Sequence, residues 1–336
     1  MHYVLKEKKP LPKSRLELRL EIPAEEISAR RGALLSAAAA AAEVPGFRKG
    51  RVPEEVVRAR MGELALWEEA AEAALRDALS ALFHAEALDA IGRPEVLILK
   101  LAPENPAEFR VLLSLYPTLS LPLYKEIAVE ENKKPKEEGG AVFEPEIDAV
   151  IARIVEEYKR ETGKNDFALS DASVLELGKF ASVGDLRLSA RETVAGYKKE
   201  QAREKRRAAL LDRLVAETKG ELPEVLIEAE LARMEAEFEA VVKGAGMAVE
   251  SYLKEVKKDR ETMRNEWRSD AKKRARLPLL LGEIARVEGI APPDDAIEAE
   301  VIRLREHYKD ADEAAARAFA TALLQHQLVI DFLERL

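Results

Sequence analysis

Apolar and charged residues alternate along residues 14–22, SRLELRLEI. A period of two places the apolar side chains on one face of a β-strand and the charged side chains on the other. The stretch therefore predicts a strand with one buried face. Pro23 stands where helices often begin, with Glu25 and Glu26 in a first turn that favours acidic residues. We expect that helix to continue to just before Pro45.

Further elements complete an N-terminal unit. A short helix is predicted from Pro53 to Gly62, and a long helix from there to about Gly92. Residues 95–101 and 108–117 are rich in Leu, Val and Ile, and they predict two strands joined by a proline-containing loop. One strand, three helices and two strands predict a small antiparallel sheet covered by helices, which is an α+β domain over residues 1–117.

Residues 118–145 are predicted to be a linker, because NKKPKEEGG is hydrophilic and contains proline and glycine. Within it, residues 123–131 are predicted as a strand. From residue 146 to residue 336 the apolar spacing is helical almost throughout. This predicts a mostly α-helical C-terminal domain with arm-like helices.

Breaks and caps divide this helical region. We expect a break at residues 162–166, a long helix capped by Ser182, and another break at 244–246. A helix over 248–288 is expected to break near Gly282 or to end at Gly289.

Composition and motifs indicate no catalytic chemistry. The 336 residues are 47% hydrophobic and 35% charged, which is typical of a folded protein. There is no cysteine, so disulfides, thiolate metal sites and cysteine nucleophiles are excluded. The four histidines lack the spacing of metal ligands, and no P-loop, GxGxxG or GxSxG motif is present. We therefore predict no catalytic residue, no metal site and no cofactor, and we expect that the protein is not an enzyme.

The charge pattern limits binding to nucleic acid. A net charge of −9 argues against a protein that coats nucleic acid over its whole surface. A local basic stretch could still bind phosphates; it contains Lys198, Lys199, Arg203, Lys205, Arg206 and Arg207. Glutamates interrupt it, which favours a solvated helix face with ion pairs over a phosphate site. A helical nucleic-acid-binding protein that uses this face is kept as an alternative.

The turn between two predicted helices at 45–51 has a different character. Its residues after Pro45 are Gly46, Phe47, Arg48, Lys49, Gly50 and Arg51. The two glycines allow tight or left-handed backbone conformations. One interpretation is a basic connection whose aromatic ring folds back onto the core. The other is a binding loop, in which the ring fills a pocket on a partner and the cations contact carboxylates or phosphates.

The segment GFRKGRVP, followed by VVRARMG, resembles the ribosome-docking signature of the trigger factor family. The similarity continues along nearly the whole chain, in FALSDASVLELGKFASVGDLR at 167–187, ELPEVLIEAELARM at 221–234 and LLLGEIARVEGI at 279–290. The resemblance implies a chaperone that meets polypeptides as they leave the ribosome.

The resemblance also implies partners. The loop at 46–51 would dock on a ribosomal protein and 23S rRNA beside the exit tunnel, and the helical arms would hold nascent or unfolded polypeptides without ATP. Free members of the family can form homodimers, so a homodimer is a further expectation. No membrane partner is expected, because MHYVLKEKKP lacks the apolar segment of a signal peptide and the alanine-rich stretch at 33–42 is too short to span a bilayer. We expect a cytoplasmic protein.

One departure from the family is large. A prolyl isomerase domain of the FKBP type normally separates the segments that resemble 144–161 and 167–187. Here only residues 162–166 lie between them. We therefore expect the isomerase domain and its activity to be missing, and residual isomerase activity is kept only as a rival hypothesis.

Apolar residues of the helical region are candidates for contact with client polypeptides. They are Met234, Phe238, Met247, Leu253, Phe319, Leu323 and Phe332. Met and Leu suit surfaces that adapt to many partners, although helix pairs could also bury these side chains against each other. The alternative to ribosome docking is a chaperone that holds unfolded proteins independently of the ribosome.

Overall fold

A computed structural model describes residues 2–43, 45, 47–48, 51–134 and 141–336. The chain forms two compact units, each made of two segments. The first unit contains Met1–Ser120 and Lys219–Arg276, and the second contains Leu121–Thr218 and Leu277–Leu336. Each unit is described below by itself.

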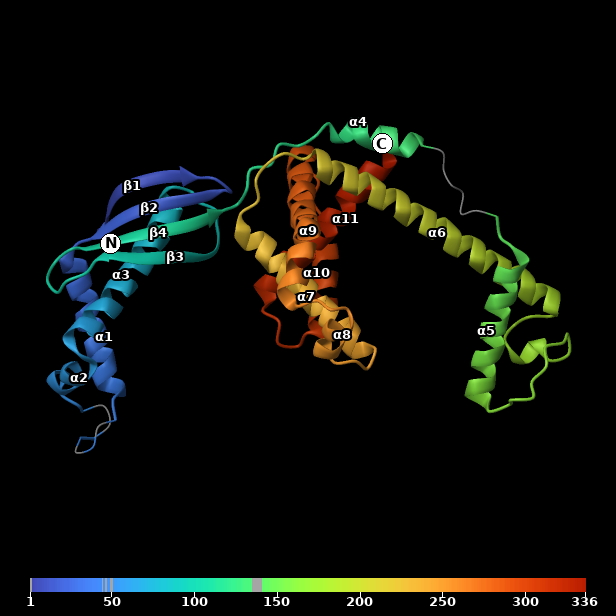
Figure 1. Cartoon of the computed structure of the whole chain (residues 1–336), viewed down its shortest axis with the longest axis horizontal. Coiled ribbons are helices and arrows are strands. Elements are labelled where there is room, and N and C mark those ends of the chain that lie inside the picture. Colours follow the sequence, from blue (N-terminus) through green and yellow to red (C-terminus); the bar gives the residue numbers. More distant parts are fainter. Residues whose placement is uncertain (1, 44, 46, 49–50, 135–140) are drawn as a thin grey trace. The chain divides into compact units, whose positions relative to one another are not determined.

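The first unit contains an antiparallel sheet of four strands (Figure 1). The strands are β1 (Val4–Leu11), β2 (Arg15–Ile22), β3 (Ala90–Lys100) and β4 (Ala107–Leu115), in the spatial order β1-β2-β4-β3. The three strands predicted from the sequence are present. The first strand was missed, because its lysines and Pro10 hide the apolar alternation; such residues are typical of edge strands.

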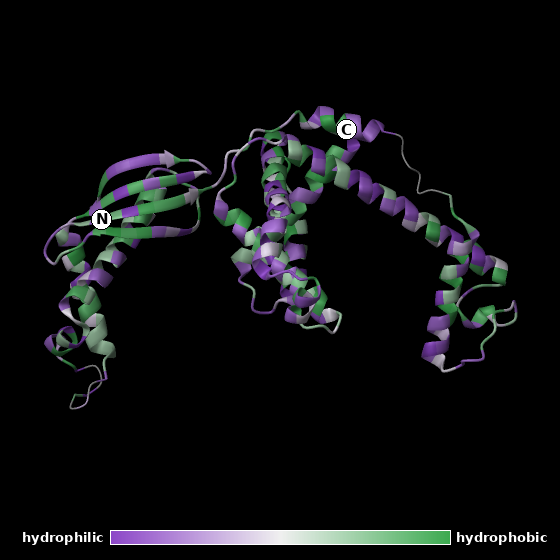
Figure 2. Cartoon of the chain, in the orientation of Figure 1, coloured by the Kyte–Doolittle hydropathy of each residue, from purple (hydrophilic) through white to green (hydrophobic). Residues whose placement is uncertain are grey.

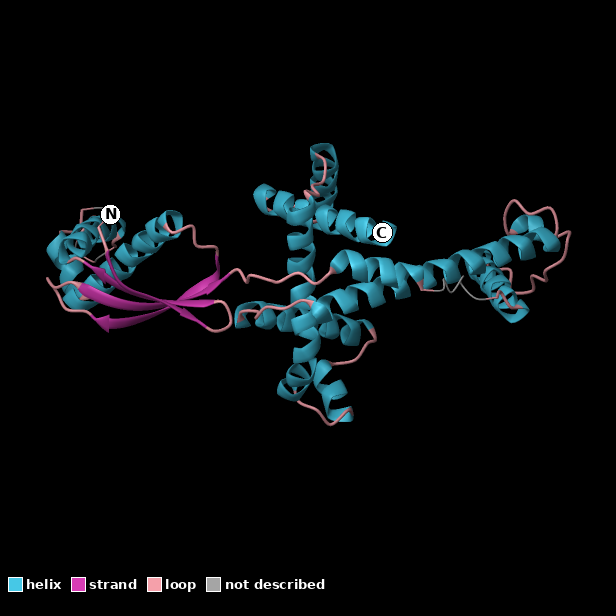
Figure 3. Ribbon diagram, turned by 90° about the horizontal axis from the view of Figure 1, so that it is seen from above, coloured by secondary structure: helices cyan, strands magenta, loops and turns pink. Residues whose placement is uncertain are grey.

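Helices α1 (Ala24–Ala41) and α3 (Glu63–Ala85) cover one face of the sheet (Figure 3), and the short helix α2 (Glu54–Met61) packs against these two helices. Along β2, fully or nearly fully buried apolar side chains alternate with charged ones, which Figure 2 shows as alternating colours; along β4 every second residue from Ala107 to Leu113 is buried. Trp67 and the alanines of α3 complete this core. The long predicted helix was wrong at its end: α3 stops at Ala85, because Ala90 already pairs with Leu115 in the sheet.

The first unit also contains a helical arm built from α7 (Glu224–Gly244), α8 (Val249–Glu255) and the first part of α9 (Arg260–Glu288). Phe238 packs its ring against Tyr252 and Trp267, with ring centroids 5.3 and 5.6 Å apart. The predicted helix over 248–288 is two helices, separated where Lys257 has a φ of +54°. Helix α9 continues through Gly282 without a break and ends just before Gly289. The expected end at Gly289 is therefore confirmed, and the expected break near Gly282 is not present.

The second unit contains α4 (Tyr124–Lys133), α5 (Glu144–Thr162), a 3-10 turn (Val174–Glu176), α6 (Val183–Glu217), the end of α9, α10 (Asp294–His307) and α11 (Glu313–Arg335). Its main core joins α4, α6, α9 and α11. Of the residues 123–131 predicted as a strand, all but Leu123 lie in helix α4, which corrects that prediction. The reason is that Tyr124, Ile127 and Ala128 all contact this core, and that spacing fits a helix.

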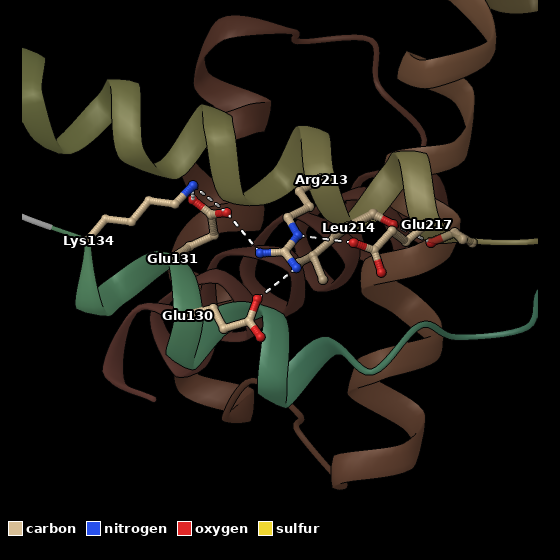
Figure 4. Close-up of polar contacts among 7 residues, drawn as sticks. Glu130, Glu131, Lys134, Arg213, Leu214 and Glu217 are labelled. Atoms are coloured by element: carbon tan, nitrogen blue, oxygen red, sulfur yellow. Dashed lines mark hydrogen bonds and ion pairs between the residues drawn. The ribbon is translucent and has the colours of Figure 1, made fainter.

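A group of charged side chains fastens α4 to α6 (Figure 4). The guanidinium of Arg213 donates to Glu217 at 3.0 Å, to Glu131 at 3.1 Å and to Glu130 at 2.8 Å. Lys134 forms a second ion pair with Glu131 at 2.6 Å. Because Glu131 is buried, these two cations supply the pairing that its carboxylate needs away from water.

The expected break after α5 and the cap before α6 are confirmed. Gly163 ends α5 in the left-handed region, with a φ of +74°. Ser182 caps α6 by accepting a hydrogen bond from the backbone of Asp185 at 3.2 Å. The predicted linker residues 135–140 lie outside the described residues.

Candidate functional site

The turn singled out in the sequence connects α1 to α2, at the end of this helix pair that lies away from the sheet (Figure 1). Gly46, Lys49 and Gly50 lie outside the described residues. Val52 is buried among the facing side chains of α1, α2 and α3, which are Leu35, Ala39, Val57 and Leu66. This contact holds the end of the turn against the helices.

Phe47 is on the surface. Its side chain is 43% exposed and belongs to none of the hydrophobic cores of the described residues. Of the two interpretations offered by the sequence, the ring folded back onto the core is not the one that the structure has. The fully buried aromatic residue of the neighbouring helix α3 is Trp67, which belongs to the core against the sheet.

The two described arginines of the turn are also exposed. The backbone N–H of Arg51 donates to the carbonyl of Arg48 at 2.9 Å, which closes a tight turn. Neither guanidinium forms an ion pair or a hydrogen bond within the described part of the chain. Both remain available to a partner, where the planar guanidinium can bind a carboxylate or phosphate through two hydrogen bonds.

Two cations of the neighbouring helix α1 are used internally. Arg31 pairs with Glu63 at 2.5 Å and lies over the ring of Trp67, 5.7 Å from its centroid. Arg30 pairs with Asp77 at 2.6 Å. Arg48 and Arg51 therefore differ from these two arginines of α1, whereas Arg58, Arg60 and Arg76 on α2 and α3 are likewise exposed and form no ion pair among the described residues.

The predicted contact residues of the arms have different environments. Phe319 is 58% exposed, and Leu323 lies one turn further along α11, so the two share one exposed face. Met247 is also exposed, between α7 and α8. These three side chains are accessible to a polypeptide.

The remaining four are partly or fully enclosed. Met234 and Phe238 are half-buried in the arm of the first unit, and Phe332 is half-buried against the core of the second. Leu253 is only 8% exposed and packs with Val242 and Val249. Its role as a contact residue is corrected: it belongs to the core of the arm, because α8 folds back on α7.

Sequence reasoning missed several exposed apolar side chains. They are Leu175, Leu188 and Ile302. No signal in the sequence marks them, because an apolar residue at helical spacing looks the same whether its face is covered or open.

Half of the basic stretch on α6 is paired with glutamates of other helices. Lys198 contacts Glu146 at 2.6 Å, and Arg203 and Arg207 contact Glu334 at 2.9 and 2.6 Å. Among the described residues, no group of three His, Asp or Glu side chains could hold a metal ion. No helix in the described part of the chain is long and apolar enough to cross a bilayer.

Comparison with known proteins gives one consistent family. A sequence profile described as "Bacterial trigger factor protein (TF)" matches residues 4–154, and one described as "Bacterial trigger factor protein (TF) C-terminus" matches residues 182–335. The chain is 25% identical to the trigger factor of Halothermothrix orenii and 23% identical to that of Carboxydothermus hydrogenoformans, over 97% of both chains in each case. A solved structure described as "Promiscuous Substrate Recognition in Folding and Assembly Activities of the Trigger Factor Chaperone" is similar with a TM-score of 0.54 at 16% identity, covering 98% of this chain and 99% of that one.

The middle of the chain differs in length from these relatives. The alignment to the Halothermothrix orenii protein spans 421 positions, whereas this chain has 336 residues, so at least 85 positions have no counterpart here. Only residues 155–181 lie between the two matched regions, and they form the end of α5, turns and the 3-10 turn. That interval is shorter than a typical domain of about 50 residues or more, so the middle isomerase region is lacking. The chain belongs to the trigger factor family of chaperones, as a form without that middle domain.

Proposed function

We propose that this chaperone docks at the exit of the ribosomal tunnel through residues 46–51 and holds nascent chains, without ATP, on apolar patches of its helical arms. The observation that carries the docking role is the exposed ring of Phe47 beside the unpaired guanidinium groups of Arg48 and Arg51. A ring and cations at the tip of a helix pair suit a site made partly of protein and partly of RNA. The ring can enter an apolar pocket while the cations contact carboxylates or phosphates.

The acidic character of the whole chain supports a single docking orientation. The net charge is −9, so most of the surface is repelled by rRNA. Lys49 and the two exposed arginines concentrate positive charge in one turn. Attraction through this turn and repulsion elsewhere favour contact at this turn over contact elsewhere on the surface.

The holding role rests on accessible apolar side chains. Each one that becomes fully buried against a client contributes about 1.5–3 kcal/mol, so a few contacts give reversible binding without energy from a nucleotide. Phe319, Leu323 and Met247 are the predicted residues that offer such surface, and Val241 and Ile302 add to it. Leu253 has no part in this proposal.

Co-sedimentation with bacterial ribosomes tests the docking role. The variant Phe47→Ala, Arg48→Ala, Lys49→Ala is expected to lose binding, while its thermal unfolding stays close to that of the parent because Phe47 and Arg48 are exposed. A matched control is Tyr197→Ala, Lys199→Ala, Lys205→Ala, which also removes one exposed aromatic ring and two cations. Ribosome binding that survives the first variant, or that is lost equally in the control, would rule out docking through this turn.

The rival of a ribosome-independent chaperone is tested separately. Light scattering of an unfolding client without ribosomes measures holding alone. We expect the loop variant to suppress aggregation as well as the parent does. A loss of suppression in the loop variant would place client binding, and not docking, at residues 46–51.

A further inference from the structure

A cavity of about 400 Å³ lies in the second unit, where α4 and α11 end beside α6. Its lining comes from three helices: Val129, Asn132 and Lys133 from α4; Arg203, Arg206, Arg207 and Leu210 from α6; and Glu334, Arg335 and Leu336 from α11 and its end. Five of these side chains are cationic. Among the described residues that line the cavity, Glu334 is the only one with an acidic side chain.

Two of the arginines are fixed in place. Glu334 accepts from Nη2 of Arg203 at 2.9 Å and from Nε of Arg207 at 2.6 Å. Burial alone would raise the pKa of Glu334, but these hydrogen bonds outweigh it, so the carboxyl group is ionised at neutral pH. The bond through Nε of Arg207 leaves its other guanidinium nitrogens for a second acceptor.

Three further cations have no partner. The side chains of Lys133, Arg206 and Arg335 form no ion pair or hydrogen bond in the described part of the chain. Arg206 is the most informative, because it is half-buried and a guanidinium removed from water is costly unless it is paired. The cavity therefore has an excess of positive charge on a molecule that is acidic as a whole.

The uncharged lining residues of the cavity limit the kinds of ligand that it can bind. Val129, Leu210 and Leu336 supply apolar surface beside the cations. None of the described residues that line the cavity is aromatic, so among them bases of single-stranded RNA would have nothing to stack on. A compact carboxylate with an apolar neighbour fits these features better than a nucleic acid does.

We propose that this cavity binds acidic segments of client polypeptides, with Asp or Glu carboxylates on Arg206 and Lys133 and a neighbouring apolar side chain on the floor. The proposal rests on the holding function and adds a substrate class to it. On an acidic chaperone such segments are repelled by most of the surface, so a local cationic cavity gives them a place to bind.

Fluorescence anisotropy with two labelled peptides tests this. One peptide of ten residues alternates Glu and Leu, and the other alternates Lys and Leu. In low salt, the full-length chain is expected to bind the Glu peptide, and Lys133→Glu with Arg206→Glu is expected to weaken that binding about tenfold or more. Hydrogen bonds to charged groups are strong enough for such a loss.

The matched control is Lys199→Glu with Lys205→Glu, which reverses two exposed charges of α6 that do not line the cavity. Its affinity for the Glu peptide should stay within about threefold of the parent. Equal weakening in both variants, or none in either, would overturn the proposal. Circular dichroism and thermal unfolding check the fold, and the neutral pair Lys133→Gln with Arg206→Gln replaces the reversal if that variant is unfolded.

Two further measurements complete the experiment. A labelled single-stranded RNA that binds more tightly than the Glu peptide, and that the cavity variant loses, would overturn the proposal in favour of nucleic acid. Ribosome co-sedimentation and protection of a neutral apolar client should be unchanged in the cavity variant. If the proposed docking or holding function is wrong, the ribosome or client assay fails for the parent chain as well. If only the proposal for the cavity is wrong, those assays succeed and the peptide assay alone fails.

Discussion

At the scale of single residues, aromatic side chains of one helical region have opposite environments. Trp67 is completely buried between the sheet and α1, with Arg31 over its ring, whereas Phe47 is exposed at the turn. Trp67 lies on the inner face of α3, in line with the alanines of that helix. Phe47 has no such neighbours, because its turn begins where α1 ends and only Val52 returns to the core. Its exposure follows from this position in the chain.

Leu253 and Phe319 should respond differently to truncation. Leu253→Ala leaves a cavity in the core of the arm and is expected to lower the free energy of unfolding by about 2–4 kcal/mol. Phe319→Ala should change it by less than about 0.5 kcal/mol but weaken suppression of client aggregation. Urea unfolding and light scattering measure the two effects. A stable Leu253→Ala variant that fails to hold clients would restore Leu253 as a contact residue.

Two glycines offer a test of backbone conformation. Gly220 has a φ of +135°, and a Cβ there would lie 2.9 Å from the carbonyl oxygen of Thr118. Gly220→Ala is expected to destabilise the first unit by about 1–3 kcal/mol, because both the backbone conformation and the contact oppose a side chain. Gly196→Ala, inside α6 with no neighbouring atom within 4 Å, should stabilise by about 0.5–1 kcal/mol. Thermal unfolding distinguishes these outcomes by sign.

At the scale of elements, α4 shows how charge places a helix. Its apolar residues contact the core of the second unit, and the charged group around Arg213 fixes its outer side to α6 (Figure 4). The hydrogen bond from Lys134 is the strongest influence on the pKa of Glu131, and together with the one from Arg213 it lowers that pKa in spite of burial. Because the pKa of Glu131 is lowered in the folded protein, the stability of the contact between α4 and α6 depends on pH.

The sign of the pH effect follows from this shift. The folded pKa of Glu131 is below that of an unfolded glutamate, about 4.3, so its stabilisation is fully present above about pH 4.3 and is lost as the pH falls through the folded pKa. Arg213→Gln should lower stability at pH 7 and reduce the further loss between pH 5 and pH 3. Urea midpoints at several pH values for the parent and the variant check this. If the urea midpoints of the parent and the variant change with pH in parallel, Arg213 does not determine the pKa of Glu131.

At the scale of the whole molecule, this chain has the two outer regions of its family and lacks the middle one. The 27 residues from 155 to 181 leave α5 and α6 packed directly on each other through Ile147, Ile151 and Leu186. Exposed Leu175 and Leu188 lie in this part of the second unit. The region is therefore compact without an inserted domain.

Loss of the middle region predicts loss of isomerase activity. In a refolding assay limited by a prolyl bond, the chain should not raise the refolding rate above the uncatalysed one, which takes tens to hundreds of seconds at 25 °C. A prolyl isomerase serves as the positive control. A clear acceleration at modest protein concentration would show that another part of the chain catalyses the reaction.

Ribosome binding should depend on salt. The proposed docking turn contains three cations in its sequence, Arg48, Lys49 and Arg51, so a plot of log affinity against log salt concentration should have a slope of roughly −2 to −3. The Lys49→Ala variant should make the slope shallower by about one. A slope near zero would argue that docking, if it occurs, depends on the ring alone.

The amino-acid sequence by itself determined the periodic elements. Strict alternation in β2, the helical spacing of α6 and α11, and the proline and glycine boundaries of α2 are local properties, so they are readable without coordinates. The sequence also singled out residues 46–51, because an aromatic residue and cations between glycines stand apart from the helices on either side. It did not determine β1, α4 or the end of α3, where partners distant in the chain decide between strand, helix and turn.

Only the tertiary structure decided which apolar and charged side chains are open. Leu253 and Phe319 both lie at helical spacing, yet one is enclosed by α7 and the other is exposed on α11. Arg203 and Arg206 are three residues apart on α6, yet Glu334 from the far end of the chain pairs with the first and not with the second. Burial and pairing depend on which elements meet in space, and a single chain's local pattern does not contain that information.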